Sequence, residues 1–215
     1  MKYGTTCGVL KPLDEVTLPD SRFEHEHLFV MRHEPGPWQL ADLHKRLSSW
    51  PPASFVPEKV RVQIETARNL MLYTLFVFEF QNVAEMQAYA ALELALRERL
   101  GNPMRQVVKK KKIKVVPLML SELLAKALSD GLIVPERLPS FEWVKYQREW
   151  FAKFYGHPHE SITSADWFNY VKSRLPNSRN YLAHGNVKLW WTESFSQVEL
   201  CVDIINALFS DSKTS

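Results

Sequence analysis

One short stretch toward the carboxyl end of the chain combines residue types that can do chemistry together. It reads Arg179-Asn180-Tyr-Leu-Ala-His184-Gly185. Histidine titrates near neutral pH and can accept a proton there, while the planar guanidinium of arginine binds anionic oxygens in a bidentate manner that lysine does not match. On a helix, Asn180 and His184 would share a face, whereas Arg179 and His184 would lie roughly 140° apart. Because Gly185 predicts a helix end, the helix could stop before His184 and let Arg179 reach it.

Arginine followed five positions later by histidine is a weak pattern by itself, and the chain contains a second instance. Arg22 and His27 have the same spacing. No polar residue follows Arg22 and no glycine follows His27, so we interpret this instance as coincidence. The stretch at Arg179 is more informative, because asparagine follows the arginine and glycine follows the histidine.

The pattern Arg-Asn-x-x-Ala-His-Gly resembles the signature of the HEPN ribonuclease superfamily, and the resemblance covers about residues 58 to 209. It implies an all-α fold, an antiparallel helical bundle, with RNA as the substrate and a homodimer that holds the motif in a cleft between protomers. It also implies cleavage without metal or cofactor, in which the 2′-hydroxyl attacks and a cyclic phosphate remains. In that reaction His184 would be the general base, Arg179 would stabilise charge on the phosphate, and Asn180 would orient the imidazole.

The resemblance leads us to expect a toxin or a phage-defence effector, with a cognate antitoxin as a candidate partner. A non-catalytic HEPN-like module that binds RNA or protein is an open alternative. So is a helix end of purely structural meaning, in which His184 complements the helix dipole and Gly185 is a cap. A bundle with a metal or small-molecule pocket is a weaker alternative, because the predicted helices contain no Glu-x-x-His motif of the kind such sites use.

Basic residues are concentrated in one place. The net charge of +3 is too small for the whole surface to bind nucleic acid, so any RNA contact needs a local patch. The candidate residues are Lys109, Lys110, Lys111 and Lys112, with Lys114 close by. They lie within 104–117, which we predict as an exposed connection rather than a packed element. The lysines could bind RNA phosphates or could only be hydrated.

Metal, redox and membrane roles find little support. The two cysteines, Cys7 and Cys201, are far apart and in no metal or redox spacing. Two histidine pairs lack a third ligand at a defined spacing, so we predict no metal site. These pairs are His25 with His27 and His157 with His159. The sequence has neither a signal-peptide core nor an apolar run of membrane-spanning length, so we expect a cytoplasmic protein.

The motif must be positioned by helices, which the apolar spacing predicts for most of the chain. Prolines interrupt residues 1–57, which we interpret as an N-terminal appendage to a HEPN-like helical domain over 58–215. In the appendage we expect a short strand over 23–32 and a helix over 38–50. Further helices are predicted over 58–80, 83–100, 121–131, 141–155, from Thr163 or Ser164 to near Pro176, and over 194–209.

Two predictions concern which side chains are buried. In the 83–100 helix, Leu92 and Leu96 belong to an apolar stripe, and we place Glu85 on the opposite, polar side. Five aromatic residues of 141–155 could stack on RNA bases, but their helical spacing favours a core or a dimer contact. They are Trp143, Trp150, Phe151, Phe154 and Tyr155. Together with the apolar run over 70–78, they lead us to expect a dimer.

Overall fold

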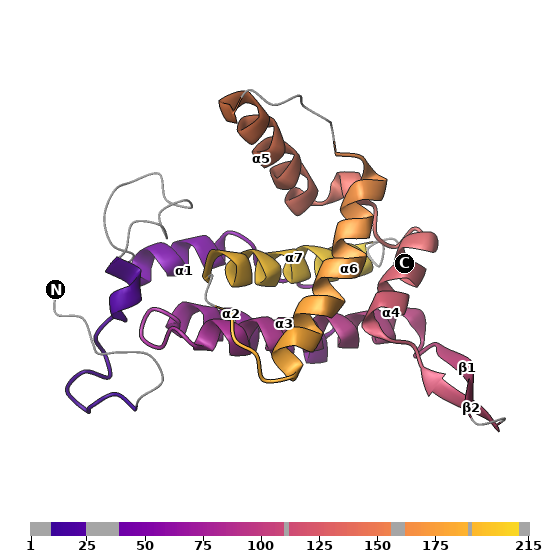
Figure 1. The fold of residues 1–215 in the computed structure, drawn as a ribbon, viewed down its shortest axis with the longest axis horizontal. Coiled ribbons are helices and arrows are strands. Elements are labelled where there is room, and N and C mark those ends of the chain that lie inside the picture. The colour runs from indigo at the N-terminus through magenta and orange to yellow at the C-terminus, as the bar shows by residue number, and fades with distance from the viewer. Residues whose placement is uncertain (1–9, 25–38, 110–111, 156–161, 189–190, 211–215) are drawn as a thin grey trace.

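The protein folds into a bundle of α-helices from which a β-hairpin projects (Figure 1). The computed structural model describes residues 10–24, 39–109, 112–155, 162–188 and 191–210. Within these ranges the elements are η1 (Ser21–Glu24), α1 (Leu40–Ser48), α2 (Glu58–Tyr73), α3 (Phe80–Leu100), β1 (Met104–Lys109), β2 (Lys112–Pro117), α4 (Leu120–Ser129), η3 (Pro135–Arg137), α5 (Pro139–Tyr155), α6 (Ser164–Ala183) and α7 (Trp191–Phe209). The predicted all-α class is confirmed in outline, with one small two-stranded sheet added.

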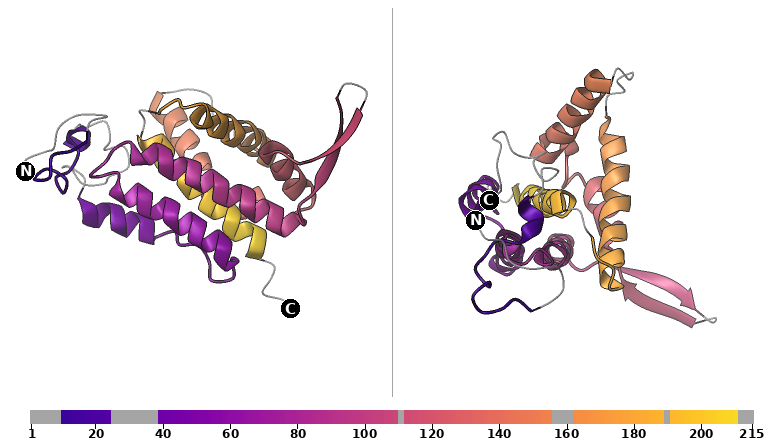
Figure 2. Two further views of the ribbon diagram at one scale, coloured as in Figure 1. Left: turned by 90° about the horizontal axis from the view of Figure 1, so that it is seen from below. Right: turned by 60° about the vertical axis from the view of Figure 1, so that its left-hand side comes forward.

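Three helices, α2, α3 and α7, form the centre of the bundle. α3 packs against both α2 and α7, which explains why its apolar residues are not confined to one stripe. One stripe of α3 consists of small buried residues that allow a close helix approach, namely Ala84, Ala88, Ala91 and Ala95. α6 packs on α3 and α4 at the outside of this centre, so it has one face free for solvent (Figure 2).

The chain turns between α2 and α3 at residues 74–79, earlier than the break predicted at 81–82. Thr74 fixes this turn. Its hydroxyl donates to the carbonyl of Met71 at 2.7 Å and accepts the indole N–H of Trp191 at 2.8 Å. The bond to Trp191 spans 117 residues of sequence, so local spacing could not predict where α2 ends.

Part of the predicted N-terminal appendage packs into the same core as the later helices. The side chain of Phe23 is fully buried. It meets Phe78 and Trp191 edge-on, with ring centroids 5.5 Å apart in both pairs. The strand predicted over 23–32 is wrong at Phe23, which belongs to the 3-10 helix η1, and residues 25–32 lie outside the described ranges.

Four other predicted helices are confirmed to within a few residues at each end. They are α1, α4, α5 and α7, which were predicted over 38–50, 121–131, 141–155 and 194–209. α1 buries Leu43 and Leu47 against the core. In α5, Trp143 is exposed and is therefore not a core residue, and the side chains of Trp150, Phe151, Phe154 and Tyr155 are not among those that the structure describes.

The segment predicted as an exposed connection is a β-hairpin, so that prediction was wrong about its conformation. β1 and β2 pair antiparallel, from Met104 opposite Pro117 to Lys109 opposite Lys112. In β2, isoleucine and valine alternate with lysine over 112–115, and β1 contains Val107 and Val108. Such β-branched residues favour strands, a signal that the run of charges obscured. An ion pair of 2.9 Å between Arg105 and Glu122 joins the base of the hairpin to α4.

α6 carries the motif, and it runs about two turns further than predicted. Thr163 caps it as expected: its hydroxyl accepts the N–H of Asp166 at 3.2 Å, and the Asp166 carboxylate accepts the N–H of Thr163 at 3.0 Å. The helix does not end near Pro176 but continues to Ala183. Proline removes one backbone hydrogen bond, but Leu182, buried beyond it, keeps the last turns packed on the bundle.

Candidate active site

One stripe along α6 faces solvent and contains two of the three motif residues. Its side chains are Ser173, Asn177, Asn180 and His184, all of them exposed. Their spacing places them on one line of the helix surface. Asn180 and His184 therefore lie one turn apart on the same face. We call this stripe the α6 crest.

The end of α6 holds His184 in line with the crest. His184 follows the last helical residue, and its N–H donates to the carbonyl of Asn180 at 3.0 Å. Gly185 then adopts a left-handed conformation with φ of 80°, and its N–H donates to the carbonyl of Leu182 at 2.9 Å. The N–H of Asn186 reaches the carbonyl of Tyr181 at 3.3 Å. These bonds close the helix as the glycine predicted, but they keep the backbone of His184 on the helical path.

Replacing Gly185 with alanine should lower the free energy of unfolding by about 1 kcal/mol, because a residue with a Cβ is disfavoured in the left-handed conformation. The new Cβ would meet nothing within 4 Å, so no clash adds to this cost. Urea denaturation of both proteins measures the difference. Gly131→Ala is the matched control, since Gly131 has φ of 69° and equally open surroundings. Equal stability of Gly185→Ala and wild type would show that the helix end does not need this conformation.

Arg179 lies on one flank of the crest and lines a pocket of about 460 Å³. The pocket is bounded by α3, by α6 and by the segment that leads from β2 into α4. The guanidinium of Arg179 is partly exposed and lies 3.7 Å from the carboxylate of Glu93. Asn180 also lines this pocket, whereas His184 does not. We call it the Arg179 pocket.

The lining of the Arg179 pocket is positively charged. Three cationic side chains, Arg97, Lys172 and Arg179, stand against the single carboxylate of Glu93. Arg97 is held by Glu93 at 2.7 Å and by the carbonyl of Leu118 at 2.8 Å. Lys172 and Arg179 are therefore the cations best placed to meet an anion, and a pocket with this balance attracts phosphate groups. The sequence did not predict Arg97 or Lys172 as site residues, because each is one of several charged residues on its helix.

Asn180 lies between the other two motif residues, Arg179 and His184, on the surface of the helix. Arg179 approaches the side-chain oxygen of Asn180 at 3.5 Å. Within the described part of the chain, no hydrogen bond or ion pair joins Arg179 to His184. The offset of roughly 140° along the helix separates them. Arg179 and Asn180 thus share a pocket, and Asn180 and His184 share a face.

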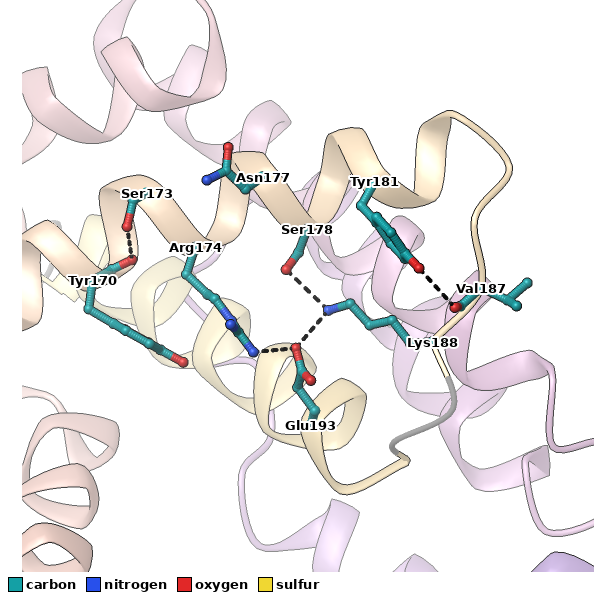
Figure 3. Close-up of a pocket in the computed structure, with 9 residues that line it drawn as sticks. All are labelled: Tyr170, Ser173, Arg174, Asn177, Ser178, Tyr181, Val187, Lys188 and Glu193. Atoms are coloured by element: carbon teal, nitrogen blue, oxygen red, sulfur yellow. Dashed lines mark hydrogen bonds and ion pairs between the residues drawn. The ribbon is translucent and has the colours of Figure 1, made fainter.

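A second pocket, of about 710 Å³, lies on the other flank of the crest, between α6 and α7 (Figure 3). Tyr170 and Tyr181 line it from α6, and each is nearly half exposed. Arg174 points into the same space and binds Glu193 of α7 at 2.5 Å. We call it the Tyr181 pocket.

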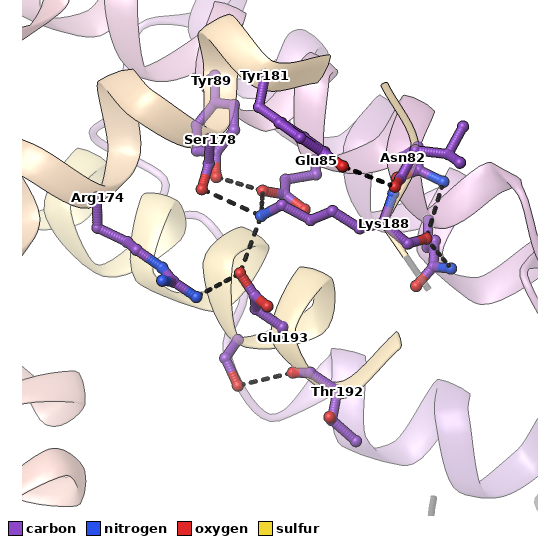
Figure 4. Close-up of polar contacts among 12 residues, drawn as sticks. Asn82, Glu85, Tyr89, Arg174, Ser178, Tyr181, Lys188, Thr192 and Glu193 are labelled. Atoms are coloured by element: carbon purple, nitrogen blue, oxygen red, sulfur yellow. Dashed lines mark hydrogen bonds and ion pairs between the residues drawn. The ribbon is translucent and has the colours of Figure 1, made fainter. Parts of the chain in front are cut away.

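Lys188 anchors the loop that follows the motif, and sequence reasoning missed it (Figure 4). Its ammonium group donates to the carboxylate of Glu85 at 2.6 Å, to the hydroxyl of Ser178 at 3.1 Å and to Glu193 at 3.1 Å. Its backbone N–H donates to the side-chain oxygen of Asn82 at 2.8 Å. Lys188 therefore ties the loop to α3, α6 and α7 at once.

Glu85 is fully buried, so its predicted place on the polar side of α3 is wrong. It shares a helical stripe with Tyr89 and with Leu92, and Leu92 was predicted to face the core. The hydroxyl of Tyr89 donates to the Glu85 carboxylate. Burial, reinforced by the charge of Glu85, raises the pKa of Tyr89 well above its usual value, so the phenol stays protonated. Burial also raises the pKa of the Cys201 thiol, with Glu85 as the second cause.

The other predicted sites are placed only in part. Lys109 and Lys112 are the last paired residues of the hairpin, at the end that projects from the bundle (Figure 2). Lys110 and Lys111 lie outside the described residues, as do both histidine pairs. Among the residues that are described, no group of three or more His, Cys, Asp and Glu side chains could hold a metal ion. None of the helices described here is both long and apolar enough to cross a membrane.

No family model, no curated protein and no solved structure matches this chain. Any functional assignment must therefore come from the site itself. Its features are an exposed histidine and asparagine on one helix face, a positive pocket at the adjoining arginine, and an aromatic pocket on the opposite flank.

Proposed function

We propose that the protein is a metal-independent endoribonuclease of the HEPN type. The observation that carries the proposal is the arrangement on α6. The exposed His184 and Asn180 share one face, and Asn180 and Arg179 line a positively charged pocket beside it. Such a pocket suits a phosphodiester, and an exposed imidazole next to it can exchange protons with the substrate.

In the proposed reaction His184 takes the proton from a ribose 2′-hydroxyl. The freed 2′-oxygen bonds to the adjacent phosphorus, the bond from phosphorus to the 5′-oxygen breaks, and the 5′-oxygen leaves with a proton from solvent. The products are a 2′,3′-cyclic phosphate and a 5′-hydroxyl. Arg179 would stabilise the negative charge that grows on the phosphate oxygens, where its bidentate guanidinium is effective. Asn180, one turn from His184, would hold the imidazole in position.

The proposed site is completed by a second copy of the chain. Arg179 and His184 of one protomer point to different sides of Asn180, so a phosphate held at Arg179 is not automatically within reach of His184. A homodimer that brings the His184 end of each α6 crest to the partner would place each His184 near the Arg179 pocket of the partner and leave the crest open at Ser173 and Asn177. The His184 end is free for this contact, because Asn180 and His184 are exposed.

Cleavage should persist in EDTA and should be abolished by a 2′-deoxyribose at the cleaved position. The nucleophile is the 2′-hydroxyl, and the charge stabilisation comes from Arg179, so chelation removes nothing that the reaction needs. Denaturing gels of a mixed RNA and of its 2′-deoxy counterpart, with and without EDTA, measure both effects. Cleavage that stops in EDTA, or that also occurs in the deoxy substrate, would refute the mechanism.

A non-catalytic RNA-binding or protein-binding module is the second candidate. The observation that favours it is that Arg179 is paired with Glu93 and makes no bond with His184 among the described residues. If this candidate is correct, the purified protein binds RNA or a partner protein but leaves RNA intact. For the catalytic proposal, a role as a toxin or defence effector with a cognate antitoxin is the biological setting that we favour.

A further inference from the structure

We propose that the Tyr181 pocket is a subsite for one unpaired nucleobase, so that the substrate is single-stranded RNA at the point of cleavage. The inference rests on the proposed ribonuclease function, which it makes more specific. Four features carry it: the charge balance of the two pockets, the exposed rings, the distance from His184, and the low crest between the pockets.

The two pockets on α6 differ in charge in a way that suits the two parts of a nucleotide. In the Tyr181 pocket, Arg174 is neutralised by Glu193 at 2.5 Å. Lys188 is shared between Glu193 and the buried Glu85. No surplus positive charge is left there to hold a phosphate, whereas the Arg179 pocket has a surplus of two cations. A backbone phosphate therefore belongs in the Arg179 pocket, and an uncharged group belongs in the Tyr181 pocket.

Aromatic rings make the Tyr181 pocket suitable for a base. The side chains of Tyr170 and Tyr181 are 44% and 47% exposed, large values for aromatic residues on a packed helix. The hydroxyl of Tyr181 lies 3.5 Å from the carbonyl of Val187, which ties the ring to the loop after the motif (Figure 3). Every base has a face that can stack on such a ring. The volume of about 710 Å³ is within the range of ligand pockets.

Tyr181 is also at the right distance from the proposed chemistry. It precedes His184 by three residues, and side chains three apart on a helix have Cβ atoms about 5 to 6 Å from each other. A base stacked on Tyr181 therefore places its own ribose beside the imidazole. Tyr170 lines the same pocket about three helical turns further along α6, too far for one base to stack on both rings, so the subsite lies at Tyr181.

The crest between the two pockets is low enough for a strand to cross. Ser173 and Asn177 line both pockets, and both are small polar residues. Asn177 forms no hydrogen bond with the other residues drawn in Figure 3, so its amide can bind a ribose or a base edge. In an A-form duplex the bases are paired and stacked, and they cannot enter a side pocket without leaving the helix. Single-stranded RNA meets no such barrier.

The test measures binding with the full-length His184→Ala protein, which keeps the pocket but is silenced for cleavage. Fluorescence anisotropy gives Kd for a short labelled single-stranded RNA and for the same RNA annealed to its complement. Adding Tyr181→Leu should raise Kd for the single strand about tenfold and leave Kd for the duplex unchanged. Adding Tyr181→Phe, which keeps the ring, should leave both values near those of the parent protein. Tyr73→Leu removes an equally exposed tyrosine from α2, outside both pockets, and is the matched control.

Circular dichroism confirms that each variant is folded before Kd is compared. Three results overturn the subsite. The first is a Kd for the single strand that does not change when Tyr181→Leu is added to His184→Ala. The others are equal binding of duplex and single strand, and no binding of RNA at micromolar protein. If wild type cleaves RNA and Tyr181→Leu cleaves it equally well, the ribonuclease proposal stands and the subsite falls. If binding depends on Tyr181 but wild type does not cleave, the subsite stands and catalysis falls.

Discussion

Replacing His184 with alanine is expected to slow RNA cleavage by about 100-fold or more. The substitution removes the group that accepts the 2′-hydroxyl proton, and no other histidine lies on the α6 crest. Arg179→Ala should have an effect of the same order, because it removes the cation beside the phosphate oxygens. Gel assays under single-turnover conditions measure both rates. The free energy of unfolding should barely change in His184→Ala, since this side chain is exposed.

Two controls separate chemistry from a general effect of charge or surface. His44 is an exposed histidine on α1, and His44→Ala should cleave RNA at the wild-type rate. Arg179→Lys keeps the charge but loses bidentate geometry, so its rate should lie between those of wild type and Arg179→Ala. Equal cleavage by wild type and His184→Ala would reject the assigned role. RNA binding without cleavage in any of these proteins would instead favour the non-catalytic module.

The sequence predicted those features of the candidate site that depend only on residues close together in the chain. Gly185 predicted a helix end, and the left-handed glycine two residues after Ala183 confirms it. The periodicity of a helix predicted that Asn180 and His184 share a face and that Arg179 is offset. The structure has all three on α6 or at its end. That these residues cleave RNA stays a prediction, which the cleavage assays described above test.

Reasoning from the sequence failed where a strong signal from one residue type hid the signal of its neighbours. Pro176 predicted a helix end, but buried side chains on both sides of it keep α6 continuous. The lysine run predicted an exposed connection, but the valines beside it and the isoleucine within it favour strands, and the segment pairs as a hairpin. In both cases one strongly disfavoured or charged residue type dominated the interpretation, while the apolar neighbours determined the structure.

Glu85 shows a further limit, because its partner is far away in the sequence. A carboxylate on the apolar stripe of α3 is costly unless a cation neutralises it. That cation is Lys188, which lies 103 residues later in the chain and just after the motif. A rule that compares only neighbouring residues assigns Glu85 to the surface. The same long-range bond places the loop after His184, so the error about Glu85 and the omission of Lys188 from the site have one cause.

Replacing Lys188 with methionine should therefore lower the free energy of unfolding by about 3 to 5 kcal/mol, because it leaves the carboxylate of Glu85 buried without its cation. Urea denaturation gives the value, and Lys126→Met, which breaks the exposed ion pair of 2.9 Å with Asp130, should cost less than about 1 kcal/mol. Adding Glu85→Gln to Lys188→Met should recover part of the loss, since a neutral side chain costs less to bury than a charge. If Lys188→Met is as stable as wild type, Glu85 is not held by this pair. If it is destabilised and Glu85→Gln recovers nothing, the loss comes from the contacts of Lys188 with Ser178 and Glu193 instead.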